Sequence, residues 1–252
     1  MAASIPGCLL EESKWWSKLL LVCGVVALVL LLAAPLGHKF GIAELGPSFI
    51  SLLAAVLLAV VTLIGGIVMA IVAGRKGLSS DRNLSAVAAL LGLLPVIVML
   101  PTVLTGRGVP PIHDITTDTA DPPTFSAALE HRMDASNDLI YGQEGFSAVE
   151  LADTQRQAYP VVKTLRSDLP TDAALDRAEA VLVELGLEII GRDVGRVEAT
   201  ATTFWFGFKD DVVVRVRNAD GGSLVDVRSV SRVGVSDLGA NAARISSFLT
   251  SF

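Results

Sequence analysis

The stretch LLLVCGVVALVLLLAAPL, residues 19–36, decides the class of the protein because it is long, apolar and free of charge. An α-helix needs about 20 such residues to cross a hydrocarbon core about 30 Å thick. Two more runs of this kind follow, at residues 48–73 and 84–105. A helix in the core of a soluble protein rarely stays uncharged on every side over this length. We therefore expect residues 19–105 to form an anchor of three transmembrane helices.

Lysine and arginine in the short loops indicate which side of the membrane each loop occupies, because they resist translocation. Lys14 and Lys18 precede the first run, and Arg75, Lys76 and Arg82 lie between the second and third runs. Only Lys39 lies between the first and second runs. This pattern predicts that residues 1–18 are cytoplasmic and that the chain after Arg107 is extracytoplasmic. In a bacterium the anchor would lie in the inner membrane and the rest in the periplasm. A cleaved signal peptide is the weaker alternative, because Glu11 and Glu12 make a poor basic start.

The three runs contain no ionisable side chain, and such side chains are what mark transport or proton relay inside a membrane. A transporter or channel is therefore not expected. Small residues gather at the end of the second run and in the third: Gly65, Gly66, Ala70, Ala73, Gly74 and Gly92. They favour close helix packing, either among the protein's own helices or against a partner's helix. Cys8 and Cys23 are interpreted as packing residues, and the later domain has no cysteine for a disulfide.

Residues 125–252 have the size and composition of one globular domain, which follows an extended strap of proline, aspartate and threonine at residues 106–124. Helical spacing of apolar residues predicts helices at about 171–185 and 238–249. Between them the period changes to two, which predicts strands at 187–191, 196–206, 212–217 and 224–230. We expect an extracytoplasmic α+β domain in which an antiparallel four-stranded meander is flanked by helices.

Charged residues on the last two strands form a polar ladder if the turn between the strands sets Arg215 opposite Asp226. Two interpretations stay open. Arg215, Arg228 and Arg232 form a basic cradle for an anion, carboxylate or lipid headgroup, or they belong to a solvated, salt-bridged sheet face, which is the commoner arrangement. Nucleic acid binding is not supported, because residues 107–252 contain 14 Lys plus Arg against 22 Asp plus Glu, a net charge of about −8.

Two further stretches are candidates for contact with a partner. The aromatic run TFWFGF, residues 203–208, is predicted to end a strand, so its rings must divide between both faces of the sheet. Another element, the membrane interface or a partner would then cover part of them, and we single out Trp205 and Phe206. The second stretch is PPIHDITTDTADPPTF, residues 110–125, with His113 and Asp114. Its proline pairs favour a stiff, extended strap that packs along the domain.

Motifs that carry catalysis or bind metal are absent from the sequence, including G-x-S-x-G, H-E-x-x-H and Walker-type loops. The aspartates of the strap lack the spacing of a calcium loop, and a single histidine beside them makes a poor zinc site. We therefore expect no cofactor, no metal and no catalytic residue. A hydrolase that uses His113 is the remaining enzymatic alternative.

The C-terminal part of the chain resembles the domain-of-unknown-function family 1499. The resemblance is carried by TFWFGFKDDVVVRVR (203–217) and VDVRSVSRVGVSDLGANAARISSFL (225–249), together with the strap and the Tyr159–Pro160 pair, and it covers about residues 109–250. It implies a membrane-tethered bacterial envelope protein and carries over no biochemical activity. A site shared with the family would draw on the matching positions Phe206, Asp210, Asp211, Arg228, Ser229, Ser231, Arg232, Gly234, Ser236, Asp237, Gly239, Asn241 and Arg244.

Together these features favour a non-enzymatic inner-membrane protein whose extracytoplasmic domain is an accessory or interaction module for another membrane or envelope protein. We favour this function because the domain lacks recognisable catalytic motifs and because one helix, instead of three, would be enough to tether it. The alternative is a domain that binds a small molecule or a lipid headgroup. Its candidate ligand-binding residues are Arg215, Arg228, Arg232, Asp237 and Asn241.

Overall fold

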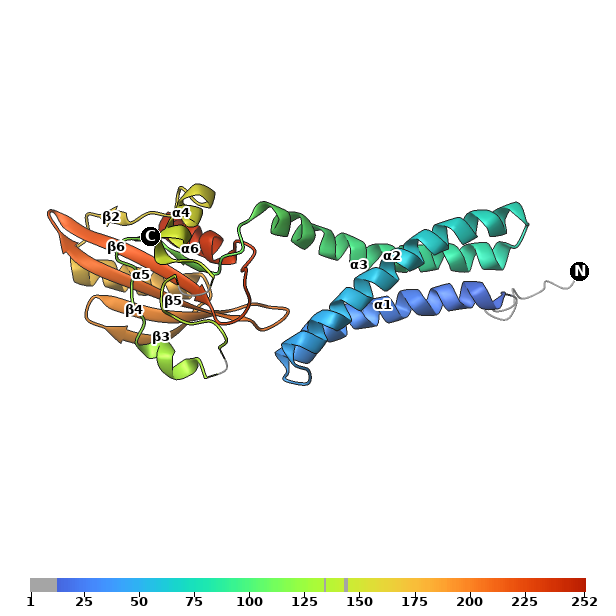
Figure 1. The fold of residues 1–252 in the computed structure, drawn as a ribbon, viewed down its shortest axis with the longest axis horizontal. Coiled ribbons are helices and arrows are strands. Elements are labelled where there is room, and N and C mark those ends of the chain that lie inside the picture. The colour runs from blue at the N-terminus through green and yellow to red at the C-terminus, as the bar shows by residue number, and fades with distance from the viewer. Residues whose placement is uncertain (1–12, 134, 143–144) are drawn as a thin grey trace, which may run out of the picture. The chain divides into compact units, whose positions relative to one another are not determined.

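The computed structural model describes residues 13–133, 135–142 and 145–252 (Figure 1). The chain divides into two compact units, Met1–Leu104 and Thr105–Phe252. The predictions made for Cys8, Glu11 and Glu12 lie outside the described residues.

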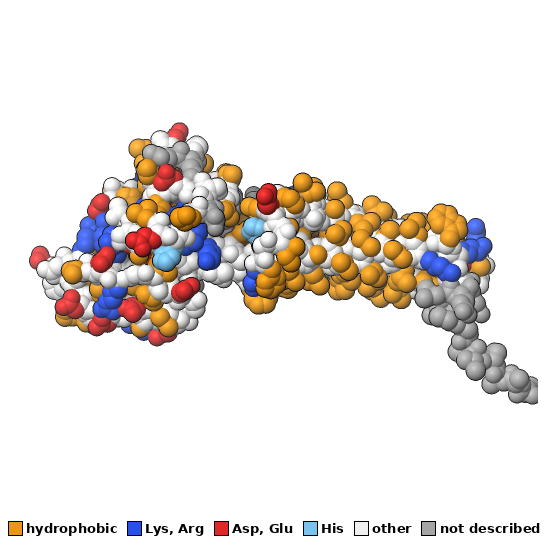
Figure 2. Space-filling view, turned by 90° about the horizontal axis from the view of Figure 1, so that it is seen from below, with side chains coloured by type: hydrophobic (Ala, Val, Ile, Leu, Met, Phe, Trp, Pro, Cys, Tyr) orange, Lys and Arg blue, Asp and Glu red, His pale blue; other side chains and the backbone are white. Residues whose placement is uncertain are grey.

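In its described residues, the first unit contains three long helices, α1 (Trp15–Lys39), α2 (Leu45–Arg75) and α3 (Ser79–Gly108). Each is long and apolar enough to cross a membrane, which confirms the three predicted apolar helices. Most of their large apolar side chains are exposed, and hydrophobic atoms cover most of the face of this unit that Figure 2 shows. Proline is tolerated inside α1 and α3, at Pro35, Pro95 and Pro101.

Small residues let the helices of this unit approach closely. A Cβ atom added to Gly92 of α3 would lie 2.6 Å from the backbone oxygen of Ala59 in α2. One added to Gly66 of α2 would lie 2.7 Å from the backbone nitrogen of Ala89 in α3. These distances are too short for any side chain, so both glycines are used in packing among the protein's own helices. Cys23 is half-buried in α1 and is a free thiol.

A buried carboxylate joins the starts of two helices. Asp81, in the first turn of α3, is 2% exposed and accepts hydrogen bonds from the Lys14 backbone N–H at 2.8 Å and the Ser17 hydroxyl at 2.7 Å. Lys14 precedes the first residue of α1, where backbone donors have no partner within the helix. Asp81 therefore supplies an acceptor for this end of α1 from another helix.

The second unit is built on an antiparallel sheet. Its strands are β1 (Asp114–Thr116), β2 (Leu165–Ser167), β3 (Glu188–Asp193), β4 (Arg196–Thr202), β5 (Lys209–Ala219) and β6 (Gly222–Ser231), in the order β1-β6-β5-β4-β3 with β2 also paired to β6. Its helices are the 3₁₀ helix η1 (Ala127–His131) and the α-helices α4 (Ala148–Ala158), α5 (Thr171–Glu184) and α6 (Ala240–Ser251). The meander from β3 to β6 confirms the predicted hairpins.

The predicted number of four strands was wrong, because the sheet has six. The two additional strands have three residues each, too few for an alternating pattern to show in the sequence, and both pair with the outer edge of β6. β1 lies in the segment predicted to be a strap. Its outer edge is completed by Gln155 of α4, whose side-chain oxygen accepts the Thr116 N–H at 2.9 Å and whose amide donates to the Thr116 oxygen at 2.7 Å.

One face of the sheet carries the apolar core. Val212, Val214 and Val216 alternate along β5 onto this face, which is packed with side chains of α5 and α6, among them Ile245 and Phe248. All five side chains are 4% exposed or less. The prediction that helices flank the sheet is thereby confirmed.

The aromatic run at residues 203–208 is a turn, so the prediction that it continues a strand was wrong. The Thr203 N–H donates to the Phe208 oxygen at 2.8 Å, and the Thr203 hydroxyl accepts the Phe208 N–H at 2.9 Å. Gly207, at φ +71°, takes the left-handed conformation that this closure needs. Local bonds between Thr203 and Phe208 thus replace the ladder bonds of a longer β4.

Candidate functional site

The second face of the sheet is polar. Its covering chain, residues 117–133 and 135–141, contains the 3₁₀ helix η1 and is otherwise irregular, whereas α-helices cover the first face. Residues paired across antiparallel strands share a face, so the register of β5 and β6 places Arg215, Asp226 and Arg228 on this side. Four acidic side chains on it are 5% exposed or less: Asp114, Glu198, Asp211 and Asp226. Buried charges need partners, and the arrangement of those partners defines the site.

The first group surrounds Asp226, which is fully buried. Its carboxylate accepts hydrogen bonds from Arg215 at 3.0 Å, Arg217 at 2.7 Å and the Thr164 hydroxyl at 2.6 Å. Arg215 lies directly opposite Asp226 in the ladder, so the turn sets the register that a polar ladder requires. The same guanidinium also reaches the strap, at Asp118 and Asp121 (3.2 and 2.9 Å). Three carboxylates therefore surround Arg215.

The second group is centred on Arg228, which is 2% exposed. Its guanidinium binds both oxygens of Asp114, at 2.9 and 2.7 Å. It also donates to the backbone oxygens of Pro123 and Leu139, at 3.1 and 2.8 Å. This one side chain thus binds β1 and two points of the covering chain.

Aromatic rings add to the enclosure of Arg228. The guanidinium carbon lies 5.4 Å from the ring centre of Phe125 and 5.5 Å from that of Tyr141, within the range of cation–π attraction. Burial raises the pKa of Tyr141, and the negative charge of Asp114 raises it further. Tyr141 is therefore held in its neutral form.

The third group is centred on Asp211, which is fully buried. Arg232 binds both of its oxygens, at 2.7 and 3.0 Å, and Arg132 from the covering chain binds one of them. Thr200 on β4 donates its hydroxyl to the same carboxylate at 3.0 Å. Asp211 is one of the positions that carry the family resemblance, and no local pattern in the sequence indicates these partners.

The remaining candidates lie at the start of α6, on the helix-covered face. Asn241 is fully buried; its oxygen accepts the Ser229 hydroxyl at 2.6 Å, and its amide donates to the backbone oxygen of His113 at 2.9 Å. Asp237 accepts the backbone N–H groups of Gly239 and Asn241, both at 2.8 Å, and so supplies acceptors at the start of α6, whose N-cap residue is Gly239. Burial raises the pKa of Asp237 despite these bonds.

The three arginines predicted to form one cradle do not converge on a common point. Arg215, Arg228 and Arg232 each bind a different buried carboxylate, those of Asp226, Asp114 and Asp211. The geometry is that of the salt-bridged face, the other interpretation of this pattern. An anionic ligand would have to displace a carboxylate of the protein, so ligand binding at these residues stays a prediction.

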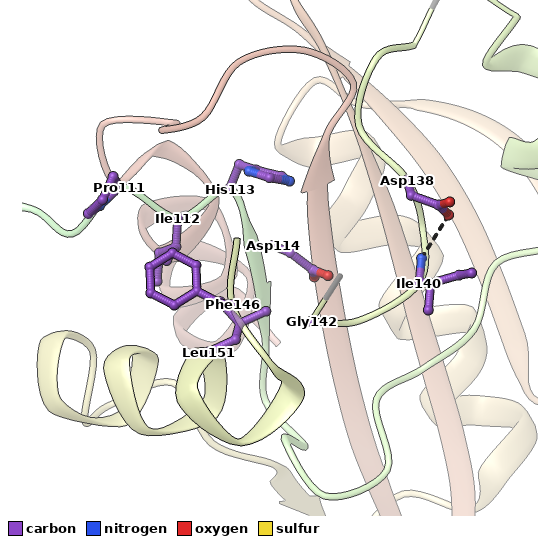
Figure 3. A pocket seen from close by; sticks show the side chains of 9 residues that line it. All are labelled: Pro111, Ile112, His113, Asp114, Asp138, Ile140, Gly142, Phe146 and Leu151. Carbon is purple, nitrogen blue, oxygen red and sulfur yellow. Dashed lines mark hydrogen bonds between the residues drawn. The ribbon is translucent and has the colours of Figure 1, made fainter. Parts of the chain in front are cut away.

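A small cavity of about 20 Å³ lies beside β1 (Figure 3). Its lining combines residues from β1 and its approach with residues from the covering chain, from the loop before α4 and from α4 itself: Pro111, Ile112, His113, Asp114, Asp138, Ile140, Gly142, Phe146 and Leu151. In Figure 3 the Asp138 carboxylate is turned to the N–H of Ile140, which it accepts at 3.0 Å. The cavity is of the size of one water molecule.

Within the part of the chain that the structure describes, His, Cys, Asp and Glu side chains form no group that could hold a metal ion. Nδ1 of His113 lies 3.4 Å from the backbone oxygen of Val235. A catalytic role for His113 stays a prediction.

The four residues predicted to contact a partner differ in exposure. Asp114 is 5% exposed and bound to Arg228, and His113 is half-buried. Phe206 is half-buried with its ring stacked on Phe208, 4.8 Å between centres. Trp205 is 53% exposed and is the one of the four that offers a large surface to another molecule.

The described chain thus combines three membrane-span-like helices with a sheet domain that has one apolar face and one ion-paired face. Residues 114–252 match the family described as "Protein of unknown function (DUF1499)", so the chain belongs to this family, and the resemblance seen in the sequence is confirmed. The match begins at the first residue of β1. Searches among curated proteins and solved structures found no significant match.

Positions that carry the family resemblance are concentrated in the polar groups described above. Arg228, Asp211 and Arg232 form two of the ion-paired groups, and Asn241 and Asp237 fix the start of α6. Arg244 adds a further pair with Asp210 at 2.7 Å. The residues of the motif thus hold β5, β6, α6 and the covering chain together.

Proposed function

We propose that this protein is a non-enzymatic accessory protein of the bacterial inner membrane. Its three helices span the bilayer with the N-terminus in the cytoplasm, and its sheet domain lies on the periplasmic or extracytoplasmic side. There the protein binds, and stabilises, another membrane or envelope protein. Distribution of basic residues in the short loops supports this orientation.

The observation that carries the proposal is the internal pairing of the arginines that were best placed to bind a substrate. Arg215, Arg228 and Arg232 each contact a buried carboxylate at 3.0 Å or less. Removing a buried ion from its partner costs several kcal/mol, about 3–5 in typical cases. Such groups hold a fold together and are poorly suited to exchange a ligand in each catalytic cycle.

The anchor supports a partner in the membrane. One helix would tether a domain of this size, yet the chain has three, and their small residues are already used in contacts such as that of Gly92 with Ala59. The outward surface consists of large apolar side chains, for example Leu53, Leu57 and Ile64 on α2 and Leu90, Leu94 and Ile97 on α3. Either lipid or a partner's helix fits such a surface.

Purification of the tagged full-length protein from native membranes tests the proposal. We expect one membrane or envelope protein to co-purify in constant ratio through several mild detergents. Recovery of the chain alone in every detergent would contradict the proposal.

Two matched triple variants locate the contact. Leu53→Ala, Leu57→Ala and Ile64→Ala change the exposed side of α2, and Leu90→Ala, Leu94→Ala and Ile97→Ala change that of α3. If a helix of the partner binds the exposed side of α2 or α3, one set releases the partner and the other retains it. Retention with both sets would leave the sheet domain and the exposed side of α1, for example Val22 and Val29, as the contact.

The orientation has its own test. In a variant with Cys8→Ser and Cys23→Ser, the substitution Val194→Cys places the sole thiol on the most exposed residue of the β3–β4 turn. A membrane-impermeant maleimide should label it in cells with a permeable outer envelope and an intact inner membrane. Labelling only after lysis would reverse the orientation.

A further inference from the structure

We propose that the sheet domain docks on the surface of the same bilayer that holds its three helices, through an apolar end formed by two segments. These are the aromatic turn, residues 203–208, and the segment after β6, residues 232–239. Together they are called the docking end below. The inference rests on the membrane anchoring proposed above and is independent of any protein partner.

Large apolar side chains are exposed at the docking end. Phe204 is 74% and Trp205 53% exposed, and their rings pack edge to face, 5.2 Å between centres. Val235 is 74% and Leu238 41% exposed on the neighbouring segment. Both segments lie at the same end of the sheet, because β4 enters the turn, β5 leaves it and β6 ends beside it (Figure 1). The end therefore presents apolar side chains from two separate loops.

The path of the chain brings this end close to the membrane. The apolar run of the third helix ends at residue 105, and a Cβ atom on the next residue, Gly106, would lie 3.3 Å from Cδ2 of Leu238. The five residues from 109 to 113 then join α3 to β1, and they can span at most about 18 Å. β1 starts at Asp114, which pairs with Val230 near the end of β6.

The opposite end of the sheet has no such constraint. The β3–β4 turn is separated from the aromatic turn by the length of β4, seven residues or about 23 Å. Its Val194 is fully exposed. The tether thus distinguishes one end of the sheet from the other, and the exposed aromatic pair lies at the tethered end.

The chemistry of the docking end fits the interface between lipid and water. Tryptophan is enriched at that depth because its ring is apolar and its N–H can stay hydrated. Lys209, next to the turn, and Arg107, at the end of α3, are exposed cations that suit anionic headgroups. The hydrogen bonds between Thr203 and Phe208 fix the turn in advance, so little conformational freedom is lost on binding.

Backbone strain at Leu238 is a further indication. Its φ of +54° makes it the one non-glycine residue with positive φ in the described part of the chain. This conformation is unfavourable for a leucine and tends to persist where it serves a function. Here it places an apolar side chain at the surface beside the end of α3.

Fluorescence of Trp205 tests the proposal. The chain has three tryptophans, so a full-length variant with Trp15→Phe and Trp16→Phe retains Trp205 alone. The purified variant is placed in nanodiscs whose lipids carry bromine either near the headgroup or deep in the acyl chains. We expect a roughly twofold drop in emission with the shallow bromine and a smaller drop with the deep one. Emission that is the same with and without bromine would overturn the proposal.

Two control variants separate docking from anchoring. Both carry Trp15→Phe, Trp16→Phe and Trp205→Phe; one adds Val194→Trp and the other adds Leu57→Trp, on the exposed side of α2. The first should not be quenched, and the second should be quenched most by the deep bromine. Quenching at position 57 but not at 205 would refute docking and leave the anchor intact. Quenching at neither would refute the anchoring itself.

A competing occupant of the docking end has a distinct signature. If a second copy or another protein covered Trp205, its emission would be shifted to the blue and remain unquenched by either lipid. That result would overturn lipid docking. Equal quenching at positions 205 and 194 would also overturn it, because contact would then not be confined to the tethered end.

Discussion

The two faces of the sheet share the same strands and are stabilised in different ways. The face under α5 and α6 is apolar, with Val212 and Val214 on β5. The other face carries Glu198, Arg228 and further buried charges under irregular chain. The difference follows from the covering element. A helix satisfies its own backbone groups and needs only apolar contact, whereas irregular chain carries N–H and C=O groups that must find partners when buried.

Glu198 and Arg228 supply these partners. The Glu198 carboxylate accepts the backbone N–H groups of Ser126 and Ala128, at 2.7 and 2.8 Å. Arg228 donates to the oxygens of Pro123 and Leu139. Charged side chains on the sheet thus take the place that ladder or helix bonds would fill. Substitutions on the two faces should therefore differ in size and in how far their effect spreads.

The largest effect is expected for Arg228→Ala. It leaves the buried Asp114 without its counter-charge and two backbone oxygens without a donor. The free energy of unfolding should fall by about 3–5 kcal/mol, measured by denaturant unfolding of the full-length protein in detergent. Arg192→Ala is the matched control, because Arg192 pairs with Asp176 and Glu179 on the open surface. An equal loss of unfolding free energy in the two variants would contradict the distinction between the buried ion pairs and those on the open surface.

Glu198→Gln should have a smaller and more local effect. The substitution replaces one carboxylate oxygen by an NH₂ group, which cannot accept a hydrogen bond from the backbone N–H groups that it faces. The free energy of unfolding should fall by about 1.5–3 kcal/mol. We expect faster hydrogen exchange at residues 125–131, with the strands β5 and β6 unchanged. Uniform acceleration across the domain would show that both faces unfold as one unit.

Ile245→Val probes the apolar face and should cost about 1 kcal/mol, because it removes one buried methylene from α6. The loss should appear as an earlier global unfolding transition, without a local change in hydrogen exchange. Selective exchange in α6 alone would mean that the helix opens independently of the sheet.

The smallest effect concerns pH. Burial raises the pKa of Asp237 above its ordinary value, so the folded protein holds this proton more tightly than the unfolded chain. The stabilising contribution is full below the unfolded pKa and is lost as pH rises through the folded pKa. Asp237→Asn removes the contribution of this carboxyl group to the pH dependence of stability. The stability of the original protein relative to the variant should therefore decrease as pH rises through the acidic carboxyl range. Parallel pH profiles of the two proteins would contradict the assignment.

Local patterns were sufficient for much of the fold. The apolar runs predicted the three helices, and alternation predicted the meander from β3 to β6. α4 was missed, although Ser147 and Glu150 form a capping box that the sequence shows as Ser followed three residues later by Glu. β1 and β2 left no comparable signal, because three residues cannot establish a period.

For the candidate site, the sequence left open whether Arg215 faces Asp226, and the register of the β5–β6 hairpin places the two residues opposite each other. The sequence did not indicate the partners of two other arginines. Arg228 binds Asp114, 114 positions away, and Arg132 binds Asp211, 79 positions away. Two interpretations of the same arginines, anion cradle or ion-paired face, have the same local sequence. Only the position of the covering chain distinguishes their geometries.

The three apolar helices, the hairpins and the family can be read from the sequence, because hydrophobicity, alternation and turn chemistry act over a few residues. Only the folded chain shows how Gly66 and Gly92 are used, where the aromatic turn breaks β4, and which carboxylate each arginine binds. The physical reason is that buried charges and close helix contacts depend on what lies opposite them in space. The separation of two residues along the chain does not show whether they lie opposite each other in the fold.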